Sequence, residues 1–252
     1  MRGGPGLGSI QPSQGDYFQA TRGGGNGDYR LIVYAPSTIQ EAINITMNAF
    51  NVAEQWRNPV MVLCDGLIGQ MMEAVEFPEY KPNPKIVDKK TWATIGTKYH
   101  DDGPHTCNSL FLDAKELHDH NVMLHKKYKQ IEEQEVKVEV SPNINDADIV
   151  VVAYGTMARI AKTAIEKINK QGYKVGMIRP ITLWPYPYHA FDNLKAKAYL
   201  VCEMSMGQMV DDVKIATRGS TAPIHFFGKA GGLIPEVEEV EAQILKLVKG
   251  GK

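Results

Sequence analysis

Apolar residues between positions 31 and 64 follow two patterns, one typical of buried strands and one typical of a helix. Residues 31–35 and 60–64 are short apolar runs that predict strands. Between them, apolar side chains recur at the three-to-four spacing of one buried helix face, at Ile39, Ile43, Met47 and Phe50. The unit predicts two parallel strands joined by a helix that crosses one face of their sheet.

Local signals bound this helix at both ends. Ser37 is followed three residues later by Gln40, which resembles a capping box and predicts that the helix begins there. The dipeptide Asn58-Pro59 should end the helix, because proline disfavours helical geometry in the residue before it.

The first 30 residues show no apolar periodicity and hold nine of the 23 glycines. We expect them to form loops or one long active loop. The predicted sheet then begins with no strand or helix before it. We therefore expect Met1 to be an internal methionine and an N-terminal portion of the first domain to be missing.

Residues 76–110 contain four prolines and charged clusters with little periodicity, which predicts an excursion from the sheet or a linker. A charged helix is expected next, near residues 112–133. With these segments, the first predicted domain covers residues 1–135.

From residue 146 the pattern becomes regular, with apolar runs alternating with amphipathic segments, as in a small α/β domain. The expected strands cover 149–153, 173–178, 198–202 and 223–227. The expected helices cover about 157–170, a segment from about 208, and 235–248. The pattern therefore predicts a second domain, residues 140–252, with a mostly parallel sheet.

Composition excludes several classes of partner. The chain has 252 residues and a formal net charge of −1, with no basic block, so charge favours neither nucleic acid nor an anionic membrane. The longest apolar runs are far shorter than the roughly 20 residues that span a bilayer. Because the glycine-rich start does not resemble a secretory signal, we expect a cytoplasmic protein.

Metal and nucleotide motifs are not recognisable. The three cysteines lie too far apart for a disulfide framework, a zinc knuckle or an iron–sulfur run. His118 and His120 would point to different faces of a helix. The glycine-rich run 23–28 lacks the Gly-Lys-Ser/Thr sequence of a phosphate loop. The sequence predicts no metal site on this chain.

The best candidate for chemistry is the loop 1–8, Met-Arg-Gly-Gly-Pro-Gly-Leu-Gly. Arg2 lies beside glycines that allow close approach, and its guanidinium can hold a carboxylate through two parallel hydrogen bonds. Residues near a chain end are normally frayed. Spacing alone therefore leaves open whether Arg2 binds an anion or is idle.

Several stretches resemble the 2-oxoacid:ferredoxin oxidoreductases, most closely the branched-chain (2-oxoisovalerate) type. These stretches are residues 1–8, 11–17, 23–25, 28–30, 58–70 and 203–208. The resemblance implies a thiamine diphosphate-binding domain of the pyrimidine type, incomplete here, followed by an α/β domain like the C-terminal domain of transketolase. Such enzymes decarboxylate a 2-oxo acid oxidatively, transfer the acyl group to coenzyme A as co-substrate and reduce ferredoxin.

The same resemblance implies roles for residues in the first loop. Arg2 would pair with the substrate carboxylate, while Gly4 and Pro5 would shape the loop at the substrate. Leu7 lies where relatives that act on smaller or dicarboxylic oxoacids resemble RGGPST. An apolar side chain there would favour a branched aliphatic substrate, and packing of the loop is the alternative role for Leu7.

The Gly-Asp-Gly and Asn-Asn motifs that usually bind thiamine diphosphate and Mg²⁺ are absent from the sequence. The resemblance therefore implies that a partner subunit binds the diphosphate and Mg²⁺. The glutamate that acts on the aminopyrimidine would precede Met1. Iron–sulfur clusters would lie on a ferredoxin-like partner subunit, and a small γ-type subunit would complete the complex.

Three polar residues follow predicted strands, where α/β proteins place their sites. Asp65 is a candidate for a site edge or a subunit contact, with a simple turn as the alternative. Glu203 and Gln208 hold a similar position in the second domain, where interface or packing roles are favoured over catalysis.

We therefore expect a subunit of a thiamine-dependent 2-oxoacid:ferredoxin oxidoreductase acting on 3-methyl-2-oxobutanoate. The alternatives are a pyruvate or 2-oxoglutarate enzyme of the same family, a lipoamide-linked dehydrogenase β subunit, and a non-catalytic assembly module.

Overall fold

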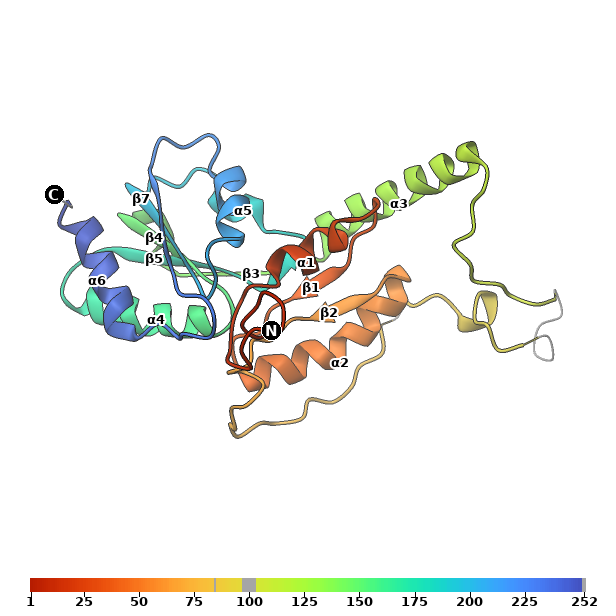
Figure 1. Cartoon of the computed structure of the whole chain (residues 1–252), viewed down its shortest axis with the longest axis horizontal. Helices are drawn as coiled ribbons and strands as arrows, with labels where there is room; N and C mark the ends of the chain where they lie inside the picture. Colours follow the sequence, from red (N-terminus) through yellow and green to blue (C-terminus); the bar gives the residue numbers. More distant parts are fainter. Residues whose placement is uncertain (84, 97–102, 251–252) are drawn as a thin grey trace.

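Two sheets lie side by side in the computed structural model, which describes residues 1–83, 85–96 and 103–250 (Figure 1). Among these residues, one sheet has three strands in the order β2-β1-β6, and the other has five in the order β3-β5-β4-β7-β8. Helices α4 and α6 pack on one face of the larger sheet, and α5 packs on the other. The core therefore has two layers of helices around the larger sheet.

The smaller sheet contains the predicted strand–helix–strand unit. β1 (Ile32–Tyr34) and β2 (Val60–Val62) are parallel, and α2 (Ile39–Trp56) connects them. The pattern does not predict the third strand, β6 (Thr182–Trp184), because a three-residue run is too short to recognise. β6 pairs antiparallel with β1, so residues from both halves of the chain form this sheet. The domain limits 1–135 and 140–252 stay a prediction.

The start of α2 differs by one residue from the prediction. Thr38, not Ser37, caps the helix, because its side-chain oxygen accepts a hydrogen bond from the backbone N–H of Glu41 (3.0 Å). The Glu41 carboxylate accepts in turn from the backbone N–H of Ser37 (2.7 Å). The helix ends before Asn58-Pro59, as expected.

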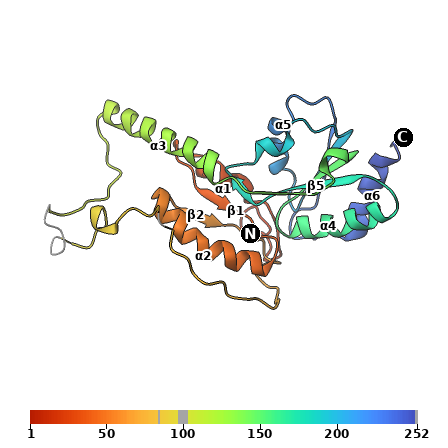
Figure 2. The ribbon, with the colours of Figure 1, turned by 180° about the vertical axis from the view of Figure 1, so that it is seen from behind.

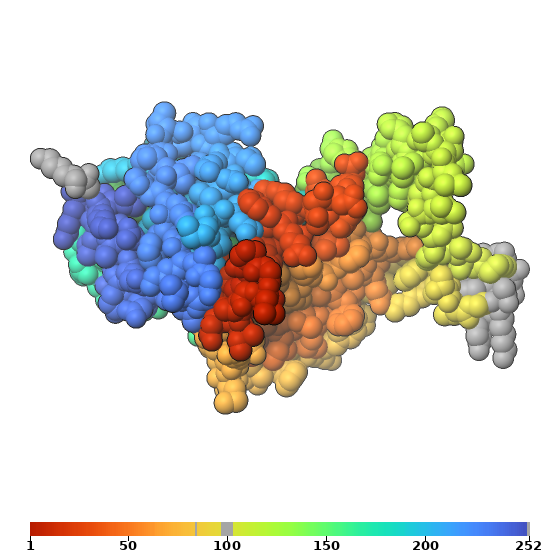
Figure 3. Space-filling view, in the orientation of Figure 1, coloured from red at the N-terminus to blue at the C-terminus, as the bar shows by residue number. Residues whose placement is uncertain are grey.

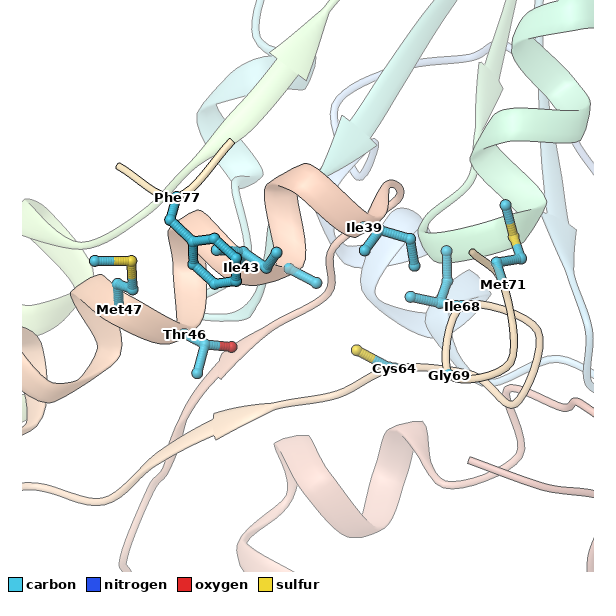
Figure 4. A pocket seen from close by; sticks show the side chains of 10 residues that line it. Ile39, Ile43, Thr46, Met47, Cys64, Ile68, Gly69, Met71 and Phe77 are labelled. Carbon is cyan, nitrogen blue, oxygen red and sulfur yellow. The ribbon is translucent and has the colours of Figure 1, made fainter. Parts of the chain in front are cut away.

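The buried face of α2 is also not the predicted one. Phe50 is 65% exposed, whereas its neighbours Ala49 and Val52 are buried. The other predicted residues, Ile39, Ile43 and Met47, are only half-buried. Together with the turn after β2 they line an open apolar pocket of about 470 Å³ (Figure 4). The helix contacts the sheet through one edge of its apolar face and leaves the rest facing this pocket.

Residues 17–25 form two short helices, so the expectation of loops alone is wrong there. They are α1 (Tyr17–Thr21) and the 3-10 helix η1 (Gly23–Gly25). Long-range contacts fix α1, because the buried Tyr17 hydroxyl donates to the Asp212 carboxylate (2.6 Å), which also accepts from Arg22 (2.8 Å). Burial, reinforced by Asp212, raises the pKa of Tyr17 well above its ordinary value.

The predicted excursion and charged helix are both present. In their described part, residues 76–110 carry only the short 3-10 helix η2 (Lys89–Thr91), while residues 84 and 97–102 of this excursion lie outside the described residues. α3 (Ala114–Gln134) follows, close to the expected limits, and only Tyr128 and Ile131 of this helix are buried. Figures 1 and 2 show α3 projecting from the rest of the molecule.

The larger sheet confirms the regular α/β pattern. Its parallel strands are β4 (Ile149–Val152), β5 (Val175–Pro180), β7 (Ala198–Glu203) and β8 (Ile224–Gly228). Its helices are α4 (Gly155–Lys170), α5 (Met209–Ala216) and α6 (Val237–Val248). Three short elements were not expected: the antiparallel edge strand β3 (Val138–Val140) and the 3-10 helices η4 (Ile144–Asp146) and η5 (Tyr188–Phe191). None of the described helices is long and apolar enough to cross a membrane.

Arg179 on β5 ties the two sheets together through ion pairs. Its two Nη atoms donate to the Glu41 carboxylate on α2 (2.9 Å each), and its Nε donates to Glu139 on β3 (2.6 Å). The Arg179 side chain is only 6% exposed. Burial opposes ionisation of Glu139, but Arg179 outweighs it with help from Lys162, and the net effect is a lowered pKa.

Substituting Arg179→Met should lower the free energy of unfolding at neutral pH by about 3 kcal/mol, because it leaves partly buried carboxylates without their cation. The lowered pKa of Glu139 means that its stabilisation is present above the unfolded pKa and is lost as the pH falls through the folded pKa. The stability difference between wild type and variant should therefore shrink on acidification. Urea titrations followed by tryptophan fluorescence measure it at each pH.

The matched control is Lys197→Met, which removes the exposed ion pair with Asp148 and should change stability by less than about 0.5 kcal/mol. An Arg179→Met effect that is equally small, or that does not vary with pH, would contradict the role given to this arginine.

Candidate functional site

The carboxyl ends of strands from both sheets meet at one place. Asp65 follows β2, Gly155 follows β4 and Met204 follows β7. A Cβ on Gly155 would lie 2.9 Å from Asp65 Oδ2 and 3.0 Å from Gln14 Nε2, and Gly155 has a φ of +55°, so this position requires glycine. Ligand sites of α/β proteins occupy such edges, which makes this the candidate site.

Asp65 is buried and bonds entirely within the chain. Its Oδ1 accepts from the backbone N–H groups of Leu67 and Ile68 (3.1 Å each) and from the Thr156 hydroxyl (2.7 Å). Its Oδ2 accepts from the backbone N–H of Thr156 at the start of α4 (2.9 Å). The carboxylate thus closes a turn after β2, the alternative role for Asp65, and also joins the two sheets.

Gln14 is a central residue that the sequence pattern does not reveal. Its fully buried side chain donates from Nε2 to the Tyr154 carbonyl (2.8 Å) and accepts at Oε1 from the backbone N–H of Met204 (3.0 Å). The amide therefore bridges the ends of β4 and β7. Gln14 belongs to the stretch 11–17 that resembles the family, but its bridging role is not visible there, because its partners lie 140 and 190 positions away.

Glu203 is fully buried at the end of β7, and its carboxylate also bonds within the chain. It accepts hydrogen bonds of 2.9–3.1 Å from four donors: the backbone N–H groups of Gln208, Met209 and Val210 and the Ser205 hydroxyl. Burial raises the pKa of Glu203, although these hydrogen bonds oppose the shift. The carboxylate holds the first turn of α5 against the end of β7.

Gln208 connects α5 to the N-terminal segment. Its Nε2 donates to the Gly15 carbonyl (2.6 Å), and its Oε1 accepts from the backbone N–H of Phe18 (2.8 Å). These contacts fit the packing role favoured for Glu203 and Gln208. A part in contacts with another subunit stays a prediction for both, as it does for Asp65.

The Arg2 guanidinium is enclosed by carbonyl groups of its own loop. Nη2 donates to the Gly6 carbonyl (3.2 Å), and Nη1 donates to the carbonyls of Gly3 (3.2 Å), Ser9 (3.4 Å) and Leu7. None of these acceptors carries a formal charge, so the guanidinium keeps its positive charge for an anion. Figure 3 shows the red N-terminal loop at the surface, beside the blue C-terminal part.

The first residues are held in place rather than frayed. The Met1 nitrogen donates to the Cys64 carbonyl, and the Met1 carbonyl accepts from the backbone N–H of Gly66 (2.9 Å). The backbone N–H of Gly3 donates to the Gln11 carbonyl (2.9 Å). In this structure Arg2 therefore has a fixed place beside the turn that contains Asp65.

The other predicted loop residues differ in their surroundings. A Cβ on Gly4 would meet no atom within 4 Å, so close packing does not require glycine there. The bond from Gly4 to Pro5 is cis. Leu7 is 93% exposed, so the alternative in which it packs the loop is wrong. A contact between Leu7 and substrate stays a prediction.

Two family descriptions match the chain. Residues 1–141 match "Pyruvate flavodoxin/ferredoxin oxidoreductase, thiamine diP-bdg", and residues 147–240 match "Pyruvate:ferredoxin oxidoreductase core domain II". The chain belongs to this family of oxidoreductases. The resemblance to 2-oxoacid:ferredoxin oxidoreductases is thereby confirmed.

Curated relatives align along nearly the whole chain. The ketoisovalerate oxidoreductase subunit VorB of Methanothermobacter marburgensis is 39% identical over 253 residues, which cover 98% of this chain and 69% of the relative. The 2-oxoglutarate synthase subunit KorA of Methanocaldococcus jannaschii is 34% identical over 265 residues, covering 97% and 71%. The expected similarity to the branched-chain type is confirmed, and the relatives are subunits of multi-subunit oxidoreductases.

A solved structure has the same fold. It is described as a 2-oxoglutarate:ferredoxin oxidoreductase from Magnetococcus marinus with 2-oxoglutarate, coenzyme A and succinyl-CoA bound. The TM-score is 0.75 at 22% identity, and the match covers 97% of this chain and 47% of that chain. Together with the family match, it confirms the predicted α/β class, in which a thiamine diphosphate-binding domain precedes a second α/β domain.

The described residues offer no ligand set for the Mg²⁺ at the diphosphate end of thiamine diphosphate. Among the residues that the structure describes, no group of three or more His, Cys, Asp and Glu side chains could hold a metal ion. The two carboxylates at the candidate site, Asp65 and Glu203, both bond to backbone N–H groups of this chain. We therefore assign no step of a reaction to that end of the cofactor on these residues.

Substituting Asp65→Asn should lower the free energy of unfolding by about 2–3 kcal/mol, because an amide NH₂ cannot accept from the buried N–H groups that the carboxylate satisfies. Urea titration measures the loss. The control Asp211→Asn, which alters only an exposed ion pair with Lys214, should change stability by less than about 0.5 kcal/mol. Equal effects of the two substitutions would mean that Asp65 does not join the sheets.

Proposed function

We propose that this chain is a subunit of an oxidoreductase that oxidatively decarboxylates 3-methyl-2-oxobutanoate. In the complete reaction, the 2-oxo acid and coenzyme A yield 2-methylpropanoyl-CoA, carbon dioxide and a proton, and the two electrons released reduce ferredoxin. The observation that carries this proposal is the similarity to VorB subunits along nearly the whole chain.

Arg2 binds the carboxylate of the 2-oxo acid in this proposal. Its planar guanidinium matches a carboxylate through two parallel hydrogen bonds. The surrounding loop carbonyls direct the guanidinium without neutralising it. A fixed, charged donor group close to the carboxyl ends of the strands supports a binding role.

Leu7 supports the branched-chain substrate. Its side chain is exposed beside Arg2 and offers an apolar surface with no hydrogen-bond donor. A second carboxylate, as in 2-oxoglutarate, would find no partner in leucine, whereas an isopropyl group would be shielded from water by it.

The remaining parts of the reaction are assigned to partners. Bound thiamine diphosphate supplies the electron sink for decarboxylation. We propose that a partner subunit holds its diphosphate and Mg²⁺, that a ferredoxin-like subunit holds the iron–sulfur clusters, and that a small γ-type subunit completes the complex. Ferredoxin is the final electron acceptor.

Coenzyme A-dependent viologen reduction by the assembled complex tests the function. We expect higher kcat/KM for 3-methyl-2-oxobutanoate than for pyruvate or 2-oxoglutarate. Arg2→Ala should lower kcat/KM by about 100-fold, because the substrate carboxylate loses a bidentate partner. The control Arg218→Ala changes an exposed arginine elsewhere and should leave kcat/KM unchanged.

Preference for 2-oxoglutarate would contradict the branched-chain assignment and would identify the substrate as that of the KorA-containing 2-oxoglutarate synthases. Stable assembly without turnover of any of the three oxoacids would leave the chain as an assembly module. An unaltered kcat/KM in Arg2→Ala would show that Arg2 does not bind the substrate carboxylate.

The substitution Leu7→Thr should shift substrate preference away from the branched acid by about 5- to 50-fold in the ratio of kcat/KM values, because it replaces an apolar contact with a hydroxyl. Parallel assays with 3-methyl-2-oxobutanoate and 2-oxoglutarate measure the ratio. Ile10→Thr is the control, since Ile10 is also exposed (82%) in the same segment. Equal ratios in the two variants would show that Leu7 does not contact substrate.

A further inference from the structure

The turn after β8 touches the Arg2 loop, although the two lie at opposite ends of the sequence. Residues Gly231 and Gly232 form this turn with φ of 69° and 102°. Figure 3 shows the red N-terminal loop lying against the blue C-terminal part of the chain.

The contact leaves no room for side chains. A Cβ on Gly232 would overlap the Gln11 side chain and lie 2.8 Å from Ser9 Oγ. A Cβ on Gly3 would lie 2.6 Å from Ser9 Oγ and 3.0 Å from the Gly231 carbonyl carbon. Separations below about 3 Å are shorter than van der Waals contact allows. Glycine is therefore required on both sides of the contact.

Ser9 is the residue through which the turn reaches the loop. Its hydroxyl donates to the Gly231 carbonyl (2.9 Å) and accepts from the backbone N–H of Gln11 (3.3 Å). Its backbone N–H donates to the Gly3 carbonyl (2.8 Å), and its own carbonyl accepts from Arg2 Nη1 (3.4 Å). A displacement of Ser9 would therefore move two of the carbonyls that enclose the Arg2 guanidinium.

We infer that Ser9 and the Gly231–Gly232 turn are positioning residues for the 2-oxo acid, which they align by holding the Arg2 loop. This inference rests on the proposed function of Arg2 as the group that binds the substrate carboxylate. The turn follows β8 of the larger sheet, and the Arg2 loop lies beside the smaller sheet. We call Ser9, Gly231 and Gly232 together the clamp. The clamp therefore fixes the position of Arg2 relative to both sheets. Ser9, Gly231 and Gly232 act through Arg2 and do not contact the substrate.

The test uses Ser9→Ala and Gly232→Ala in the assembled complex. Ser9→Ala should raise KM for the 2-oxo acid by about five- to tenfold, because the hydroxyl loses its hydrogen bond to the Gly231 carbonyl. Gly232→Ala should raise this KM at least as much, because its Cβ would push Gln11 and Ser9 out of place. The kcat value and KM for coenzyme A should stay within about twofold, because a contact equally present in the bound and transition states affects KM alone. Thermal unfolding is measured in parallel and should show an unchanged midpoint for Ser9→Ala.

Two controls separate positioning from strain and from loss of a hydroxyl. Gly172→Ala places alanine at a similar positive φ, +92°, where a Cβ would meet no atom within 4 Å. Ser220→Ala removes a hydroxyl that accepts from the backbone N–H of Ala222 in an exposed turn. Both variants should keep wild-type KM values for the 2-oxo acid and for coenzyme A.

A double-mutant cycle connects the clamp to Arg2. If Ser9 acts through Arg2, Ser9→Ala should cause no further rise in KM when Arg2 is already alanine. Additive effects on KM would overturn the inference, and so would unchanged KM in Ser9→Ala and Gly232→Ala beside a large effect of Arg2→Ala. Failure of the proposed function is distinct, because it is measured on the wild-type complex, which would then prefer another oxoacid or reduce viologen with none of them.

Discussion

A buried carboxylate, that of Asp65, connects the turn after β2 to the start of α4, and the arrangement of the candidate site depends on this connection. A buried anion is tolerated only where donors surround it, and here backbone N–H groups from both sides supply them together with the Thr156 hydroxyl. The strand ends are thereby drawn so close that Gly155 has no room for a side chain. Gln14 then fills the remaining gap between β4 and β7.

Most of the fold could be predicted because short apolar runs and regular helix faces are local signals. The parallel strands of the larger sheet and the charged helix α3 were found in this way. The missed elements, β3, β6 and α1, are three to five residues long and exist because distant residues pair with them. The predicted buried face of α2 is wrong because periodicity shows which residues are apolar but not how many of them the sheet covers. Phe50 fits the periodic pattern and is nevertheless exposed.

The candidate site was predictable only in part. Asp65 and Glu203 could be named because polar residues directly after buried strands are recognisable, and Arg2 because its glycine-rich loop resembles that of a known family. The roles of Gln14 and of the Gly231–Gly232 turn could not be predicted, because they depend on contacts between residues far apart in the sequence. The exposure of Leu7, which excludes a purely packing role, could also not be predicted from its sequence neighbours.

The pairing of β6 with β1 has a consequence for how the protein is made. On the ribosome, β1 emerges long before Thr182–Trp184, so one edge of it stays unpaired while the intervening residues are synthesised. An open strand edge of this kind is a site for wrong pairing between nascent chains. The smaller sheet can be completed only after β6 has been synthesised. The two halves of the chain therefore depend on each other during folding and also pack together in the folded molecule.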